Sequence, residues 1–577
     1  MRRCFLSALF GLLLSGVSAA DAPRATSQNA PPEAYLPGDP LPYFGSEDPW
    51  DRRAFKRPHN PNEGARIGQA QIIDLIEGRR EDALASAREW LDRDPAAGES
   101  RFGLILALAQ AGELSAAERE LNVLLDLGFP PERFLAGPRS LTASLQQFPT
   151  FQQRIAGQTH GLVHGPMLGV VTPQSVRIWV RTESETEVEV RVAEGWDLTN
   201  PVRTARGRTR ADADFTGVVE VTGLKPSTEY AYRLFVAGRE VPRWSEWSFR
   251  TAPPAASPEQ VRIAFGACSH YTPVNERVWD TIRLRRPDAF LTLGDNVYID
   301  LAGEVNGLHD YTYYCRQSRP EWRRLTGSTP IYAIWDDHDC VIDDVFMGPY
   351  VDQPSWKLGH FQVFRRNWNN PSYGAEPEWP ATWFNFRLGA VEVFMLDGRF
   401  YRENWARDGA SMLGPVQKRW LLDALRKSTA TFKVLASPVP WADDSKTAAA
   451  GGIANDTWAG YRAEREEIFE LIARERINGV ILLSGDRHRT DVRLIPRPGA
   501  YGLYEIESGR LTNANFHAPH GDTLFAYTDM QTFSVLTFDG AADDPVVKME
   551  IVNIEGKTVW ERDVPLRELS VPPARSR

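Results

Sequence analysis

The spacing of apolar residues along the chain changes twice. Between residues 65 and 156, apolar residues recur every three or four positions, in the stretches 72–76, 83–91, 102–109 and 114–125. This period is typical of amphipathic helices, and Asp94-Pro95 and Gly112 interrupt it where turns are expected. The pattern predicts a helical segment over residues 65–156.

The small residues of this segment resemble tetratricopeptide packing. Ala83 and Ala87 repeat at helical spacing, as do Ala107 and Ala111. Only about two repeat units are visible, whereas a free-standing array needs three or more. We therefore expect a helical cap that packs on the rest of the chain, with a protein partner as an open alternative.

Between residues 161 and 254 the period changes to two. The stretches 175–180 and 188–192 alternate apolar and polar residues, as half-buried strands do. The run from Gly223 to Tyr232 resembles the strand-corner signature of fibronectin-type sandwiches. The pattern predicts a small immunoglobulin-like or fibronectin-like β-sandwich over residues 161–254.

From residue 259 to residue 565 short apolar strands alternate with helical stretches such as 415–426 and 462–474. The strands are expected at 262–265, 289–293, 331–335, 391–396, 432–437 and 479–483. This alternation predicts a layered α/β domain, in which loops at the strand ends carry function.

The first twenty residues have the composition of an export signal. Arg2 and Arg3 precede the largely apolar stretch 5–17, and small residues follow at 17–20. The start resembles a twin-arginine signal, and an ordinary Sec signal is the alternative. A Pro-rich arm or linker is expected over residues 21–64. We expect a periplasmic or extracellular protein with no transmembrane segment in the mature chain.

The net charge of the chain limits the kinds of molecule that it is expected to bind. The chain of 577 residues has a formal charge of −10, which argues against specific nucleic-acid binding. It does not exclude an anionic substrate, because a bound metal dominates the local field. Cleavage of the signal would leave Cys268, Cys315 and Cys340, and the sequence leaves open whether Cys315 and Cys340 pair.

Potential metal ligands follow four of the predicted strands. They are Cys268-Ser269-His270, Asp295 with Tyr298, Asp336-Asp337-His338-Asp339, and Asp486 with His488. Carboxylate oxygens suit hard cations, while imidazole and thiolate suit borderline metals. Side chains at several strand ends can converge on one site. Two cations held there would clamp the oxygens of a phosphoryl group.

The order of these motifs resembles the PhoD-like alkaline phosphatases and phosphodiesterases, a branch of the calcineurin-like metallophosphoesterases. The matching motifs are Gly294-Asp295-x-x-Tyr298, the Trp335–His338 run with Asp339, Leu396-Asp397-x-Arg399-x-Tyr401, and Gly485-Asp486-x-His488. The resemblance covers residue 161 to the C-terminal region. It implies a four-layer αββα domain that binds a ferric ion and a second, divalent cation, often calcium.

The resemblance also implies residue roles. Carried over position by position, the metal ligands are Cys268, Asp295, Tyr298, Asp337, Asp486 and His488. Cys268 and Tyr298 would bind the ferric ion, and Asp295 would bridge both metals. Relatives often have an Asn shortly after the Trp335–Asp339 run, where this chain has Asp343 or Asp344. This departure leaves the second metal's full ligand set open.

The implied reaction is hydrolysis of a phosphomonoester or phosphodiester by a metal-bound hydroxide at the two-metal site. His338 is expected to protonate the leaving oxygen or to donate a hydrogen bond to its developing charge, and Arg399 is the candidate for holding a phosphate oxygen. A structural salt bridge between Arg399 and Asp397 is the alternative. The substrate is expected to be a small phosphate ester or a phospholipid. Phospholipase D-type cleavage is a variant, and a non-catalytic surface-binding protein with a vestigial metal site is the competing hypothesis.

Overall fold

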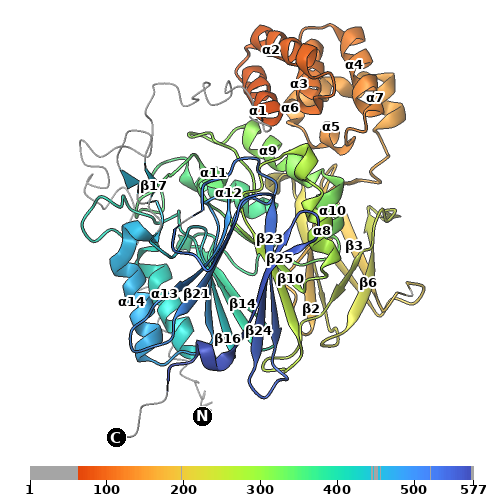
Figure 1. Ribbon diagram of the computed structural model, residues 1–577. Helices are drawn as coiled ribbons and strands as arrows, with labels where there is room; N and C mark the ends of the chain where they lie inside the picture. Colours follow the sequence, from red (N-terminus) through yellow and green to blue (C-terminus); the bar gives the residue numbers. More distant parts are fainter. Residues whose placement is uncertain are drawn as a thin grey trace, which may run out of the picture.

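The computed structural model describes residues 63–196, 198–443, 446–447, 453–454, 456–519 and 521–572. The predicted export signal and nearly all of the predicted arm lie outside these residues. In Figure 1 the chain runs from a group of helices at one end of the molecule, through a first pair of β-sheets, into a second and larger pair. Among the described helices, none is long and apolar enough to cross a membrane.

The N-terminal helices gather above the edges of the sheets (Figure 1). They are α1 (Glu63–Ile76), α2 (Arg80–Arg93), α3 (Gly98–Gln110), α4 (Leu114–Asp126), α5 (Glu132–Ala136), α6 (Arg139–Thr142) and α7 (Pro149–Arg154). Four of them, α1 to α4, contain the stretches with helical spacing. Both α1 and α5 pack against α9 (Gly307–Gln317) of the following domain.

A buried carboxylate ties this helical segment to α9. Glu99 on α3 accepts two hydrogen bonds from the Arg133 guanidinium, at 2.7 and 3.0 Å. It also accepts one from the Tyr311 hydroxyl of α9 at 2.6 Å and one from Arg319 at 2.7 Å. Burial alone would raise the pKa of Glu99, but the charges of Arg133 and Arg319 outweigh it and lower this pKa to about 2.

We expect Glu99→Gln to lower the free energy of unfolding by about 3 kcal/mol at pH 7, because folding lowers the pKa of Glu99 from 4.5 to about 2. The depressed pKa stabilises the fold fully above the unfolded-state pKa near 4.5. That contribution is lost as the pH falls towards 2. Thermal unfolding at pH 7, 4 and 3 measures it. A variant as stable as wild type at pH 7 would contradict the assignment.

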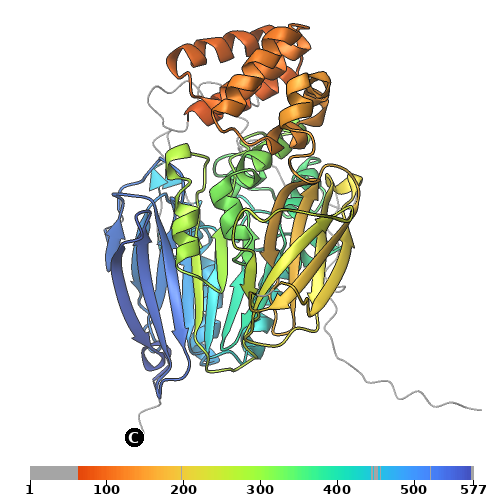
Figure 2. The ribbon, with the colours of Figure 1, turned by 90° about the vertical axis from the view of Figure 1, so that its right-hand side faces the viewer.

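Residues 162–250 form two facing sheets (Figure 2). The first has the order β1-β2-β5, and in the second β8 pairs with β6 beside the order β4-β3-β6-β7. The strands are β1 (Leu162–Gly169), β2 (Ser175–Thr182), β3 (Glu187–Glu194), β4 (Arg203–Arg208), β5 (Thr216–Thr222), β6 (Glu229–Val236), β7 (Arg239–Glu240) and β8 (Ser248–Arg250). Alternating inward Val and Ile side chains of both sheets form the core between them.

The rest of the chain contains a six-stranded and a seven-stranded sheet, with the orders β11-β10-β9-β23-β24-β25 and β14-β15-β16-β19-β21-β20-β22. The strands of the first are β9 (Val261–Gly266), β10 (Ala289–Leu293), β11 (Ile331–Ile334), β23 (Thr532–Asp539), β24 (Val546–Asn553) and β25 (Thr558–Pro565). Those of the second are β14 (Phe384–Leu388), β15 (Val391–Met395), β16 (Phe432–Ala436), β19 (Val480–Ser484), β20 (Thr490–Ile495), β21 (Leu503–Ser508) and β22 (Phe525–Tyr527).

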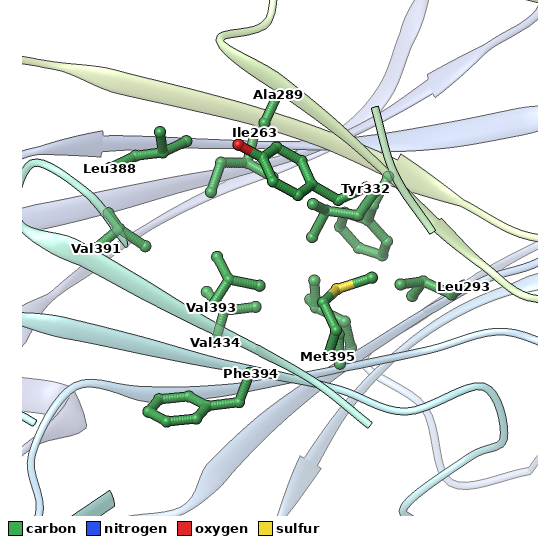
Figure 3. Packing of buried hydrophobic residues seen from close by; sticks show 14 of the residues in the cluster. Ile263, Ala289, Leu293, Tyr332, Leu388, Val391, Val393, Phe394, Met395 and Val434 are labelled. Carbon is green, nitrogen blue, oxygen red and sulfur yellow. The ribbon is translucent and has the colours of Figure 1, made fainter. Parts of the chain in front are cut away.

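The two large sheets pack face to face. Ile263, Tyr332 and Met395 are among the apolar side chains that fill the space between them, while Phe394 points to the opposite face (Figure 3). Helices cover the outer faces. Trp420 of α13 (Gly414–Lys427) lies against Phe394, with ring centroids 6.2 Å apart, and Trp279 of α8 (Val278–Leu284) lies 6.0 Å from Phe290 of the other sheet. The arrangement is helix, sheet, sheet, helix.

The helices that follow residue 258 connect these strands or lie beside their ends. They are α8 (Val278–Leu284), α9, α10 (Pro320–Thr326), α11 (Asp337–Cys340), α12 (Lys357–Asn367), α13 (Gly414–Lys427) and α14 (Arg462–Arg474). Short strand pairs β12 (Gly374–Ala375) with β13 (Trp379–Pro380) and β17 (Lys446–Thr447) with β18 (Ile453–Ala454) lie in loops. Strands β9, β10 and β11 are parallel, as are β15, β16, β19 and β21. Parallel strands end at the same edge, so the loops after both parallel sets meet there.

Candidate metal centre

The loops that follow β9, β10, β11 and β19 approach one another too closely for side chains at two positions. A Cβ on Gly294 would lie 2.5 Å from Asp336 Cβ, and a Cβ on Gly485 would lie 2.4 Å from Ala267 Cβ. Gly294 also has a φ of +104°, which L-residues rarely adopt. The glycine of each Gly-Asp pair therefore lets the strand ends converge, and the following Asp is carried into the shared space.

A first group of candidate ligands forms around Asp295. Single ligand atoms of Cys268, Asp295 and His488 all lie within 4.8 Å of one another, and all three side chains are buried. The Tyr298 hydroxyl lies in the same group, because it donates to Asp295 Oδ2 at 2.9 Å and is 3.2 Å from His488 Nε2. Asn513 donates its amide to the Tyr298 oxygen at 2.8 Å. Four predicted ligands therefore come together from three different loops.

A second group shares Asp295 with the first. Ligand atoms of Asp295, Asp337 and His338 lie within 4.8 Å of one another. Because one carboxylate belongs to both groups, the arrangement can place two cations side by side with Asp295 between them. A carboxylate in such a position could bridge two metal ions.

Among the clustered Asp residues after β11, only Asp337 belongs to this second group. The Asp339 carboxylate accepts backbone N–H groups of Asn296 and Asp336, at 3.1 Å each, and so fastens two strand-end loops together. Asp336 pairs with Arg399, and 75% of the Asp343 side chain is exposed. Asp339 and one oxygen of Asp336 therefore have partners outside this group, and Asp343 faces solvent.

The donor set fits a cation. Oδ1 of Asp295 and Nδ1 of His488 are buried without a hydrogen-bond partner among the described residues. Burial, reinforced by Asp337 and Asp336, raises the pKa of Asp295 despite the opposing charge of His338, and burial raises the pKa of Cys268. An excess of buried acidic groups is stable in ionised form only beside compensating positive charge. A bound metal ion would supply that charge.

Backbone strain collects at the same residues. Cys268, Asp295, Asp486 and His488 have φ values of 59°, 52°, 73° and 47°. Non-glycine residues in this left-handed region cost of order 1 kcal/mol or more each, and such residues cluster at functional sites. The converging loops therefore hold these four side chains in conformations that a relaxed turn would not adopt.

His338 has a buried carboxylate partner that the sequence did not indicate. Its Nδ1 lies against Asp300 Oδ1 within hydrogen-bonding distance. An ionised carboxylate only accepts hydrogen bonds, so Nδ1 carries the proton and donates it. Burial alone would lower the pKa of His338, but Asp300 and Asp337 outweigh it and raise that pKa. Asp300 follows Tyr298 by two residues in an irregular loop, where no spacing rule points to it.

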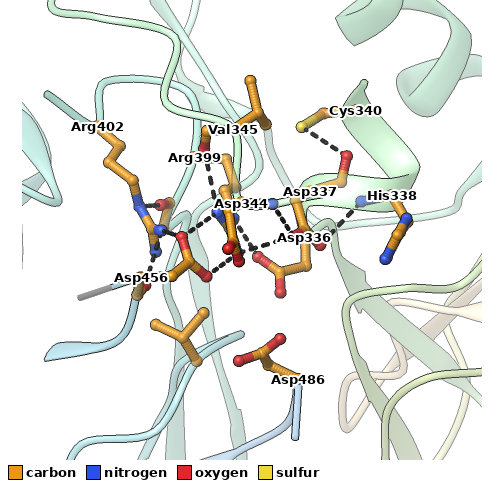
Figure 4. Close-up of polar contacts among 12 residues, drawn as sticks. Asp336, Asp337, His338, Cys340, Asp344, Val345, Arg399, Arg402, Asp456 and Asp486 are labelled. Carbon is orange, nitrogen blue, oxygen red and sulfur yellow. Dashed lines mark hydrogen bonds and ion pairs between the residues drawn. The ribbon is translucent and has the colours of Figure 1, made fainter. Parts of the chain in front are cut away.

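Arg399 is placed differently from its prediction. It is fully buried, and its Nη1 and Nη2 each donate to one Asp456 oxygen at 2.8 Å, while its Nε donates to Asp336 (Figure 4). Asp397 accepts from the Arg399 backbone N–H at 2.8 Å. The expected grip on a phosphate oxygen does not fit this placement, since the guanidinium is fully buried and already donates to Asp336 and Asp456. The alternative pairing with the Asp397 side chain is also not what the structure has.

A third group of acidic ligand atoms, from Asp337, Asp344 and Asp456, lies beside Arg399. Arg399 and Arg402 both donate to Asp456. The two guanidinium groups therefore already balance negative charge in this third group. Asp486 belongs to none of the three groups, but its carboxylate faces Asp336 and Asp337 from the opposite side (Figure 4).

The structure also places the other cysteine and histidine residues. Cys268, Cys315 and Cys340 are all free thiols, so Cys315 and Cys340 do not pair in this structure. His270 is buried with its ring 4.8 Å from that of Tyr298, and it lines the site. The His517 ring stacks on the His488 ring, with centroids 5.2 Å apart, and the sequence offered no signal for this contact. His520 lies outside the described residues.

Comparison with known proteins agrees with this geometry. Residues 263–529 match the family model of the PhoD-like phosphatases, and residues 159–254 match a domain of unknown function (DUF7800). Alkaline phosphatase D of Bacillus subtilis (strain 168) is 27% identical over 312 residues, which are 47% of this chain and 52% of that protein. The chain thus matches about half the length of this curated relative.

Two solved structures share the fold. A structure of PhoD superposes with a TM-score of 0.57 and 17% identity, covering 70% of this chain and 92% of that one. Purple acid phosphatase PPD1 from yellow lupin (Lupinus luteus) seeds superposes with a TM-score of 0.53 and 12% identity, covering 71% and 76%. The resemblance seen in the motifs is confirmed. Residues 263–529 therefore match the PhoD-like phosphatase family, and this match fits the calcineurin-like phosphoesterase superfamily.

Proposed function

We propose that this protein hydrolyses phosphate esters at a two-metal site in its PhoD-like domain. The observation that carries the proposal is that two groups of buried ligand atoms share Asp295. The name of the Bacillus subtilis relative, an alkaline phosphatase, supports the same reaction class. Buried carboxylates that lie close together repel one another, so a gain in folding stability does not explain them.

The two groups of ligand atoms suit different metal ions. Cys268, Tyr298 and His488, together with Asp295, offer thiolate, phenolate and imidazole, which suit a ferric ion. Asp337 with Asp295, and Asp486 facing them, offers carboxylate oxygens, which suit a divalent cation such as calcium. When bound, two such cations neutralise charge on the phosphoryl oxygens and lower the pKa of a water molecule.

The side chains around the ligands have complementary tasks. His338, held at Nδ1 by Asp300, donates a proton to the leaving oxygen. Asn513 donates to the Tyr298 oxygen and fixes the direction of the phenol. Arg399 is a positioning residue, since its Nε holds Asp336 and its Nη2 lies 3.5 Å from Asp337 Oδ2.

A panel of substrates tests the reaction class. Purified protein supplied with Fe³⁺ and Ca²⁺ is expected to release phenol from an aryl phosphate monoester, an aryl phosphate diester or both. Choline release from phosphatidylcholine would identify the phospholipase D-type variant. If no ester is cleaved although both metals are bound, the protein is a non-catalytic binding protein and the proposal is wrong.

Export and domain organisation belong to the same proposal. Arg2, Arg3 and the apolar stretch that follows support an exported enzyme, and the two sheets of residues 162–250 support an accessory fibronectin-like sandwich. Cell fractionation with a reporter fused to residues 1–30 tests the export signal. Retention of the reporter in the cytoplasm would contradict it.

A further inference from the structure

The helical segment reaches into the candidate metal centre through α1. Gln69 donates its side-chain amide to the backbone carbonyl of Tyr298 at 2.6 Å, and Arg66 forms an ion pair with Asp300. The Arg66 guanidinium also lies over the Tyr298 ring, 5.7 Å from its centroid. Two side chains one turn apart on one helix therefore contact both ends of the short segment 298–300.

The Asp300 carboxylate is shared between two partners. Its Oδ2 accepts from Arg66, and its Oδ1 accepts from His338 Nδ1. With one oxygen fixed by Arg66, the carboxylate plane cannot turn without breaking the bond to His338. The side chains of Arg66, Asp300 and His338 are 18%, 13% and 15% exposed, so water competes only weakly for these contacts. Orientation of the His338 ring therefore depends on a residue of the helical segment.

We infer that the helical segment completes the catalytic site, with Arg66 as a positioning residue that fixes His338 through Asp300. This inference rests on the proposed function, because it assigns His338 the proton transfer to the leaving group. Residue 66 lies outside both regions that match a family model. The contact is thus supplied by a part of the chain beyond those regions.

A leaving-group comparison tests the inference in the full-length, metal-loaded protein. We expect Arg66→Ala to lower kcat roughly 10–100-fold for an alkyl phosphate, whose alkoxide leaves only when protonated. For p-nitrophenyl phosphate, whose phenolate leaves without a proton, kcat should fall no more than about threefold. KM should not change for either substrate, and Arg66→Lys should recover most of the loss because an ammonium can still fix Asp300.

Arg101→Ala is the matched control. Arg101 also forms a part-buried ion pair in the helical segment, with Glu120, but it does not contact the site. Arg101→Ala should leave kcat unchanged for both the alkyl phosphate and p-nitrophenyl phosphate. Equal losses for both substrates in Arg66→Ala, in step with a lower melting temperature, would show a merely structural role and overturn the inference.

Hydrogen exchange of backbone amides tests the positioning role of Arg66 without a measurement of enzyme activity. The Ile299 N–H donates to the His338 carbonyl at 3.0 Å, so peptides spanning residues 294–303 report on the loop. Arg66→Ala should speed exchange in these peptides, and Arg101→Ala should not. If wild type cleaves no ester, the proposed function fails. Unchanged exchange in Arg66→Ala would by itself refute the positioning role.

Discussion

Asp295→Asn is expected to lower kcat/KM for phosphate esters at least about 10³-fold, because Asp295 is the only side chain shared by the two groups that contain His488 and His338. The amide preserves the volume of the side chain and removes the charge that both cations require. Steady-state kinetics with an aryl phosphate measures the loss. Activity within tenfold of wild type would show that Asp295 does not bridge two metals.

The control for this variant is Asp280→Asn. Asp280 on α8 is a half-buried carboxylate in an ion pair with Arg324 at 2.6 Å, on the outer face of the same domain. Asp280→Asn makes the same change from carboxylate to amide at a position outside the site. Wild-type kinetics are expected, so a fall in both variants would point to folding rather than to chemistry.

His338→Gln is expected to show the second largest effect. It should lower kcat for alkyl phosphates by about 10²–10³-fold and barely affect p-nitrophenyl phosphate, since a general acid contributes only where the leaving group needs a proton. A plot of log kcat against leaving-group pKa measures this, and the variant should have the steeper slope.

For His338→Gln, equal losses across the series would contradict the role of His338 as the proton donor. His160→Gln, in the turn that precedes β1, serves as the control for a His-to-Gln change and should reproduce the wild-type slope.

The position of the site was predictable because of where the strands end. The expected strand at 289–293 has the same bounds as β10, and the one at 331–335 differs from β11 by one residue. Short, strongly apolar stretches of this kind indicate buried strands. Parallel strands bring their carboxyl ends to one edge of a sheet. The residues that directly follow such strands, Asp295 and Asp337, therefore fall in the predicted place.

Arg399 shows where this reasoning stops. An Arg just past a strand end looks like a phosphate contact, yet its partner Asp456 is 57 residues further along the chain in an irregular loop. Sequence spacing cannot reveal a pair at that separation. The same holds for Asp300 and Asn513, which hold His338 and Tyr298 from loops without periodicity.

The C-terminal strands were missed for a different reason. Strands β23, β24 and β25 complete the six-stranded sheet, and β23 pairs directly with β9. Their residues alternate in part, as in the pattern of β24, but no motif drew attention to them. Attention to period-two alternation beyond residue 530 would have predicted them.

Metal content tests the central claim most directly. Elemental analysis of purified, full-length protein by inductively coupled plasma mass spectrometry gives the number of bound metal ions per chain. The account predicts about two per chain in wild type, one of them iron, and a loss of both in Asp295→Asn. Full ester hydrolysis by a protein that contains no metal ion would contradict it.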